Sequence, residues 1–434
     1  MPVIASMLLQ TAFGIVDAFF VGMLGPLELA AISLSFPIVY IFIAIGTGLE
    51  IGTNALVSQA VGRKDLKKAG CFASNALFLA ALLAVLVSIA SIVIAPALFG
   101  LMSSDEKVVE LAFQYSTPIF AGVIFTFAWF ISDALLRAQG NSRTPMKNLA
   151  FAVVLNAILD PFLIFGIGPF PKLGLFGAAI VTVFADFVAA ALNFAYIFSG
   201  STMVKLELKN FRFDPGCIKH LVLVGLPVTV SSSISAIGFF LLTVIVGTFG
   251  SLAIAAYGIG MRINSISVLP VVGMESGVAS FVGQNFGAKN FERAKKVAVF
   301  GTMLSLAFAT AIAAVAILFP AQLAGIFTSD QTVIEFGKQY LLIVPLAYVL
   351  YGLYFSMQGA FEGIGKTWLV LATNIVYWAT AVGVALLLSE QIGITGIWIA
   401  IVAAAALEAV AVIIIFYSGI WLKQSAKKAG GQDF

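Results

Sequence analysis

Carboxylates inside long apolar stretches are the residues of this chain whose positions suggest chemistry. A charged carboxylate at the centre of a membrane-spanning helix costs about 2.5–3.5 kcal/mol on insertion scales, so each one is by default a candidate to bind an ion, a proton or a charged partner. Seven carboxylates fit this description: Asp17, Glu50, Asp133, Asp160, Asp186, Glu275 and Glu408. The sequence suggests no partner for Asp186 or for Glu408.

One group of polar residues is expected to converge. Asn156 and Asp160 are four positions apart, so they share one face of a helix. Asp17 and Thr182 are expected at a similar depth in two other spans, and Pro161 leaves one backbone carbonyl of its helix free. Two carboxylates, an amide, a hydroxyl and a carbonyl suit a proton or a hard monovalent cation such as Na⁺. The alternative is a hydrogen-bonded network that only packs helices together.

A second group of charged residues is expected nearer one end of the spans. Glu50 and Glu275 stand in duplicated G-x-E-x-G segments, whose glycines form a GxxxG pattern that packs helices closely. These carboxylates are expected to cap helices or to pair with Arg262, the deep cation of the eighth span, or with loop lysines. Asp133 precedes Arg137 by one helical turn, which predicts a salt bridge at the water boundary. Glu50, Glu275, Arg262 and Asp133 are therefore candidates for gating or for a secondary proton site.

The composition places all these residues in a membrane protein. Of the 434 residues, 61% are hydrophobic and 10% are charged, and the mean hydropathy is +1.09. Soluble domains are about 45–50% apolar and about 25% charged. These values exclude a soluble enzyme, a disordered protein and a nucleic-acid binder. Cys71 and Cys217 are far apart and His220 is the one histidine, so no metal site or redox motif is suggested.

Long apolar runs separated by Gly, Pro and charged residues predict twelve spans in an all-α integral membrane protein. No cleavable signal peptide is visible, and the abrupt start suggests that a cytoplasmic lead-in is missing. The predicted spans are residues 2–22, 28–57, 70–95, 108–136, 148–166, 174–198, 221–248, 252–282, 297–319, 335–360, 369–389 and 393–422.

The distribution of basic residues predicts the orientation. With the N-terminus in the cytoplasm, nineteen of the 23 Lys and Arg residues fall in inside loops. Because cytoplasmic loops carry the excess of basic residues, both termini are predicted to be cytoplasmic. The expected location is the plasma (inner) membrane, with the lipid bilayer as a partner and no nucleic acid.

The chain contains an internal repeat. A shift of 225 residues aligns its start with its middle over some 69 positions: Pro2 meets Pro227, and residues 48–52 and 273–277 share the pattern G-x-E-x-G. Because six spans are an even number, both copies insert in the same sense, as in transporters with parallel repeats. Such a pair places a substrate cavity between its halves.

The repeat predicts two pseudo-symmetric six-helix lobes. The expected organisation is an N-terminal lobe at 1–198, a cytoplasmic linker at 199–220, a C-terminal lobe at 221–422 and a cytoplasmic tail at 423–434.

Four stretches of sequence resemble the multidrug and toxic compound extrusion (MATE) family, and the similarity covers essentially the whole chain in order. The family's first-span signature resembles IVDAFFVGMLGP, and three later stretches also match; the stretches are residues 15–26, 135–140 (LLRAQG), 155–161 (LNAILDP) and 174–179 (GLFGAA). The Asp160-Pro161 element is similar to the DNA-damage-inducible-type subfamily, and the seventh span lacks the buried acid that is typical of the other bacterial subfamily.

The resemblance implies a V-shaped, monomeric bundle that exports amphipathic, often cationic compounds in exchange for H⁺ or Na⁺. It also implies that Asp17, Asn156, Asp160 and Thr182 bind the coupling cation. Phe13 and Gly14 stand where relatives often have Tyr and Asn, so H⁺ and Na⁺ both stay as alternatives for the coupling ion.

Three alternatives are weighed against this function. A flippase for a lipid-linked substrate would need several basic residues in its cavity, and an integral-membrane enzyme would need a catalytic cluster that the isolated His220 does not provide. A channel is disfavoured because a two-lobe repeat suits alternating access. No GxxxxGK[ST] motif occurs. We therefore expect an ion gradient to supply the energy, and we expect no cofactor and no enzymatic activity.

Overall fold

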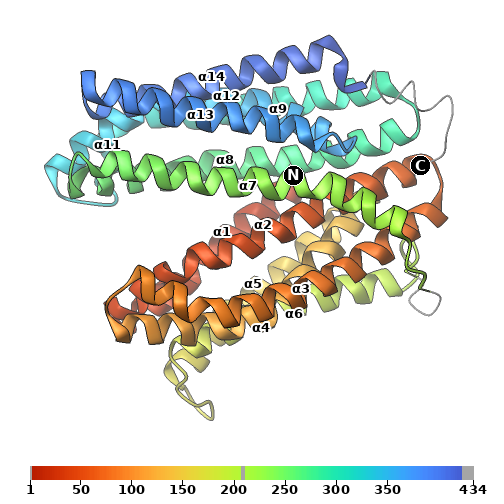
Figure 1. The fold of residues 1–434 in the computed structure, drawn as a ribbon, viewed down its shortest axis with the longest axis horizontal. Helices are drawn as coiled ribbons and strands as arrows, with labels where there is room; N and C mark the ends of the chain where they lie inside the picture. The colour runs from red at the N-terminus through yellow and green to blue at the C-terminus, as the bar shows by residue number, and fades with distance from the viewer. Residues whose placement is uncertain (1, 207–210, 423–434) are drawn as a thin grey trace. The chain divides into compact units, whose positions relative to one another are not determined.

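The computed structural model describes residues 2–206 and 211–422, and in these ranges the regular structure is entirely helical (Figure 1). The predicted tail at 423–434 and part of the predicted linker lie outside the described residues. The helices are α1 (Pro2–Gly22), α2 (Pro26–Gly62), α3 (Leu66–Met102), α4 (Glu106–Ala138), α5 (Arg143–Phe165), α6 (Leu175–Phe198), α7 (Pro215–Gly247), α8 (Ser251–Gly287), α9 (Phe291–Leu318), α10 (Pro320–Gly325), α11 (Gln331–Ile343), α12 (Pro345–Gly363), α13 (Thr367–Ile392) and α14 (Ile394–Ser418).

The predicted twelve spans are confirmed with one modification. Among the described residues, eleven helices are long and apolar enough to cross a membrane, and α11 with α12 makes a twelfth span that is bent by 40°. Pro345 follows the break at Val344 and lacks the amide hydrogen that a continuous helix would use there. Most helices extend several residues beyond the predicted spans, because their ends continue past the apolar core.

The internal repeat is visible in the local structure. α2 and α8 begin and end 225 residues apart, and both are followed by a lysine in the left-handed region, Lys64 at φ 61° and Lys289 at φ 59°. The next helix is then capped by a side chain, Asp65 or Asn290, that accepts a hydrogen bond from the amide three residues on, at 3.0 and 3.2 Å. The two copies thus build the same helix-turn-helix.

The chain divides into two compact units, Met1–Thr229 and Val230–Phe434, so that α7 begins in the first and ends in the second. The core of the first unit is rich in Phe, Leu and Ala between α2, α3 and α4. The core of the second contains a group of buried aromatic residues, which includes Tyr257, Tyr340, Tyr348, Tyr351, Tyr354, Tyr377, Trp378 and Trp398.

Glycines bring helix backbones close together in the first unit. A Cβ atom added to Gly48 of α2 would lie 2.7 Å from the carbonyl oxygen of Gly225 in α7, and one added to Gly52 would lie 3.2 Å from that of Leu221. The predicted GxxxG packing is therefore present here, and it fixes the first half of α7 against α2.

The second copy of the motif packs differently. A Cβ atom added to Gly277 of α8 would have open space around it. The close approach is made by Gly359 and Gly363 of α12, where added Cβ atoms would collide with the backbone of Glu275 and Ala279 in α8. The glycines that allow this close packing therefore lie on α12 and not on α8.

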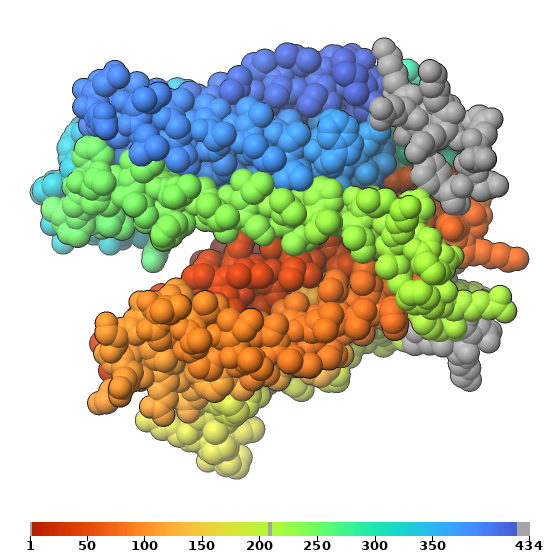
Figure 2. Space-filling view, in the orientation of Figure 1, coloured from red at the N-terminus to blue at the C-terminus, as the bar shows by residue number. Residues whose placement is uncertain are grey.

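α3 is the orange helix on the visible surface in Figure 2, and its exposed residues form an apolar stripe. Leu82, Leu86, Ile89 and Val93 are exposed at spacings of three and four residues. A stripe of exposed leucine, isoleucine and valine on a helix of this length is suited to contact with lipid chains.

Candidate functional site

Asp17 lies at a contact between helices of the first unit. Its side chain is buried on α1, and Tyr115 of α4 donates a hydrogen bond to its Oδ2 at 3.4 Å. α1 packs along α5, which carries the second predicted carboxylate.

Asn156 and Asp160 occupy one face of α5, as their spacing predicts. Both are completely buried, and the Asn156 amide donates to Asp160 Oδ1 at 3.4 Å. Asp160 interacts electrostatically with Asp17 and with Tyr115. The neighbouring helix α6, which packs along α5, carries Thr182 with a buried hydroxyl.

Each of the four predicted residues has one buried oxygen atom without a hydrogen-bond partner in the described part of the chain. These atoms are Asp17 Oδ1, Asn156 Oδ1, Asp160 Oδ2 and Thr182 Oγ1. A buried polar atom normally has a partner, because leaving it unpaired costs about 1–3 kcal/mol. Two carboxylates that interact in a poorly hydrated place also need a proton or a cation to balance their charge. The donor set fits a hard cation or protons shared among the oxygens.

Sequence reasoning missed two partners of the buried acids. Tyr115 faces Asp17, and the Thr126 hydroxyl donates to Asp186 Oδ2 at 2.6 Å. Both partners lie on α4, and neither tyrosine nor threonine in an apolar helix is distinctive enough to signal such a contact. Asp186 is thus paired, whereas Asp17 keeps one oxygen free.

Arg137 is the centre of a buried ion cluster. The predicted salt bridge to Asp133 is present at 2.6 Å, and the same guanidinium nitrogen also contacts Glu50. Glu50 thus has a partner in its own unit that the sequence did not suggest. α4 packs along α2, and Arg137, one residue beyond the predicted fourth span, points into the unit and is 5% exposed.

Arg262 lies on α8, within the predicted eighth span. Its side chain is exposed, and in residues 2–206 and 211–422 it has no ion pair within 4 Å. α8 buries the face that carries Tyr257, Gly260 and Ile263, which leaves Arg262 on the opposite face.

The second unit holds a separate group of buried acids. Glu275 interacts electrostatically with Glu362 and Glu408, and all three are less than a tenth exposed. Gln358 donates to Glu408 at 2.9 Å. Glu362 was missed because the predicted tenth span ended before it.

The family model described as MatE matches the chain twice, over residues 2–162 and 227–387. The chain belongs to the MatE family. MatE proteins are transporters and not enzymes, so the structure is that of a multi-span membrane transporter. The two matches begin 225 residues apart, which agrees with the repeat in the sequence.

Curated relatives of this MatE protein cover most of its length. A protein named FAD transporter from Shewanella oneidensis is 29% identical over 86% of this chain and 83% of its own length. The probable multidrug resistance protein NorM of Thermotoga maritima is 27% identical over 98% of this chain and 92% of its own.

Solved structures share the fold of this MatE protein. A MOP superfamily transporter from Pyrococcus furiosus superposes with a TM-score of 0.91 at 27% identity, over 98% of this chain and 95% of that one. A structure described as the outward-facing conformation of a multidrug resistance MATE family transporter superposes with a TM-score of 0.90 at 26% identity, over 99% of this chain and 95% of that one.

Proposed function

We propose that this MatE protein is an antiporter that exports small amphipathic, often cationic organic compounds in exchange for H⁺ or Na⁺. The relatives named as multidrug resistance proteins support the class of substrate. The observation that carries the proposal is the set of four unpaired buried oxygens on Asp17, Asn156, Asp160 and Thr182.

The coupling mechanism follows from the charge of this site. Without a bound ion, Asp17 and Asp160 repel each other in a place from which water is excluded. Binding of Na⁺ or of protons removes this repulsion and draws α1, α5 and α6 together. The resulting change of the N-terminal lobe expels the exported compound, and release of the ion on the other side resets the site.

The proposal includes a subfamily and an orientation. The LNAILDP stretch and the absence of a carboxylate from α7 support membership in the DNA-damage-inducible-type subfamily. The excess of basic residues in alternate loops supports cytoplasmic termini.

The test is efflux of a fluorescent organic cation from proteoliposomes that contain the purified full-length protein. H⁺ and Na⁺ gradients are imposed separately, so the gradient that drives transport identifies the ion. Asp160→Asn should abolish gradient-driven transport, because the amide can neither release a proton nor balance a cation.

Asp186→Asn is the matched control. It makes the same change one helix away, and the new amide oxygen still accepts the Thr126 hydrogen bond, so transport should persist. Full activity of Asp160→Asn, or equal loss in both variants, would contradict the proposed site.

A second substrate class is suggested by the relative named FAD transporter. FAD is an anionic flavin nucleotide, so the same vesicles should be assayed with FAD. Transport of FAD without transport of organic cations would replace the proposed substrate, while the ion dependence would still test the site.

A further inference from the structure

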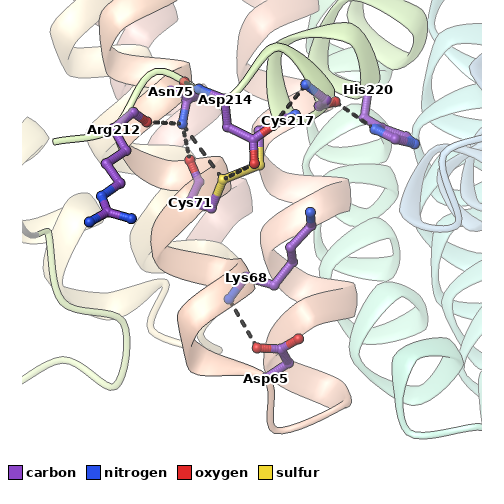
Figure 3. The surroundings of a disulfide bond; sticks show 9 residues. Asp65, Lys68, Cys71, Asn75, Arg212, Asp214, Cys217 and His220 are labelled. Atoms are coloured by element: carbon purple, nitrogen blue, oxygen red, sulfur yellow. Dashed lines mark hydrogen bonds between the residues drawn. A yellow bond between two sulfur atoms is a disulfide. The ribbon is translucent and has the colours of Figure 1, made fainter. Parts of the chain in front are cut away.

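A cluster of metal-ligand atoms lies outside the proposed transport site, where α7 begins beside α3. Cys71 of α3 and Cys217 of α7 form a disulfide, and Asp214 precedes α7 (Figure 3). One ligand atom from each of these three residues lies within 4.8 Å of the other two. We propose that in the reduced protein Cys71, Cys217 and Asp214 bind a soft divalent cation of the Zn²⁺ class.

The carboxylate is oriented toward the sulfur atoms. Asp214 Oδ1 accepts the amide hydrogens of Gly216 and Cys217 at 2.8 and 3.1 Å, which fixes the side chain as the helix cap. Its Oδ2 then lies 3.4 Å from Cys71 Sγ. A disulfide sulfur has no hydrogen to donate to this oxygen, whereas a thiol does, and a cation between the two atoms would satisfy both. The contact therefore favours the reduced pair.

Asn75 positions the first sulfur and the carboxylate together. Its side-chain amide lies 3.6 Å from Cys71 Sγ, and its Oδ1 accepts the Asp214 amide hydrogen at 3.0 Å. Asn75 is buried at 1% exposure, so it holds this geometry from inside the unit. Amide hydrogen bonds to thiolate sulfur are typical of the shell around metal–thiolate sites.

The identity of the ligands selects the class of metal. Two thiolates and one carboxylate suit Zn²⁺ or Cd²⁺, with water as the fourth ligand, and disfavour Mg²⁺ and Ca²⁺. His220 does not belong to this group of ligand atoms: its Nδ1 bonds to the Gly216 carbonyl at 2.7 Å and its ring packs on Phe72. Cys217 is fully buried, but Cys71 and Asp214 are half-buried, so solvent reaches one side of the cluster.

The choice of the reduced state rests on the proposed orientation, which places the cluster on the cytoplasmic side, where thiols are kept reduced. A cytosolic dithiol reduces the Cys71–Cys217 disulfide. The two cysteines gain two electrons and two protons and become thiols, and the cytosolic dithiol is oxidised to a disulfide. Binding of the divalent cation then releases the two thiol protons.

The experiment uses full-length protein in detergent, reduced with a phosphine and freed of metal by a chelator. Alkylation with mass spectrometry first counts the free thiols, and Cd²⁺ is then titrated while thiolate-to-cadmium absorption in the ultraviolet is recorded. We expect one Cd²⁺ per protein, absorption that is lost in Cys71→Ser with Cys217→Ser, and protection of both thiols from alkylation by Zn²⁺.

The Asp214→Asn variant distinguishes the proposed metal-ligand role of this side chain from its role as the cap of α7. Asparagine is as good a cap as aspartate, so α7 keeps its start, while cadmium affinity should fall about tenfold or more. Asp65→Asn is the control, because Asp65 caps α3 in the same way without facing a sulfur, and it should bind Cd²⁺ like the unchanged protein.

Three results would overturn the proposal: a disulfide that survives reduction in the folded protein, no thiolate absorption on titration, or equal affinity in Asp214→Asn and Asp65→Asn. Each is distinct from a failure of the transport proposal, because none depends on transport activity.

Discussion

Replacing Arg137 by methionine should destabilise the protein by about 3 kcal/mol, because two carboxylates would lose the cation between them. The Arg137 side chain is 6% exposed, and those of Glu50 and Asp133 are 17% and 19% exposed. Removing one partner of a buried pair costs about 3–5 kcal/mol, and we take the lower end because both acids retain some contact with solvent.

The neighbouring variants test whether uncompensated charge is the cause. Glu50→Gln and Asp133→Asn each leave Arg137 with one carboxylate, so each should cost about 1 kcal/mol. The triple variant, Glu50→Gln with Asp133→Asn and Arg137→Met, carries no charge in the cluster. It should be more stable than Arg137→Met alone, because neutral groups of similar shape replace the whole cluster.

The assay is titration of the purified protein with sodium dodecyl sulfate in mixed micelles, followed by the fluorescence of tryptophans that include Trp129 on α4. Arg143→Met is the control, since Arg143 is exposed at the start of α5 and should change stability by less than about 0.5 kcal/mol. Stability of Arg137→Met within about 1 kcal/mol of the unchanged protein would refute the reasoning, as would a triple variant less stable than Arg137→Met.

Three further predictions concern other parts of the chain. Gly359→Ala should destabilise by about 1–3 kcal/mol because its Cβ would collide with the Glu275 backbone, whereas Gly277→Ala should be neutral or slightly stabilising; unfolding that shows equal effects would contradict the packing described. Tyr115→Phe should reduce ion-driven efflux several-fold while the protein stays folded, since Asp17 loses its hydrogen-bond donor; unchanged apparent ion affinity would exclude Tyr115 from the site. Burial lowers the pKa of Lys366 from its usual 10.5, so the folded state binds its proton less tightly than the unfolded state does, and stability should rise with pH between the lowered pKa and 10.5. The free energy of unfolding of Lys366→Met should not rise over that pH range. If the variant and the unchanged protein have the same pH profile, Lys366 is not the source of the rise.

The sequence predicts the helices and the repeat well, because lipid requires long apolar segments and because duplicated turns keep their residues. Lys64 and Lys289 show this, since each follows a helix end in the same left-handed conformation. The bend at Val344 is harder to foresee. Both sides of it are apolar, so hydropathy reports one continuous span.

The partners of the charged residues are the part that sequence cannot supply. The Asp133–Arg137 bridge is local and follows from helical spacing, but the contact of Arg137 with Glu50 depends on how α2 packs against α4. The Cys71–Cys217 pair is separated by 146 positions, so no spacing rule could find it. The depth of residues along their predicted spans does suggest which oxygens lie near Asp160, because residues at the same depth on neighbouring helices can come into contact.

The bent tenth span has a consequence for biosynthesis. α11 has 13 residues and α12 has 19, lengths of about 20 and 28 Å, whereas the hydrocarbon layer is about 30 Å thick. α11 is too short to cross by itself and α12 is near the lower end of the spanning range, so the span is complete only when both halves insert together. If both halves were left outside the bilayer, α13 and α14 would cross in the wrong direction. Substitutions near Val344 should therefore produce topological isomers of the chain before they affect any property of the folded protein.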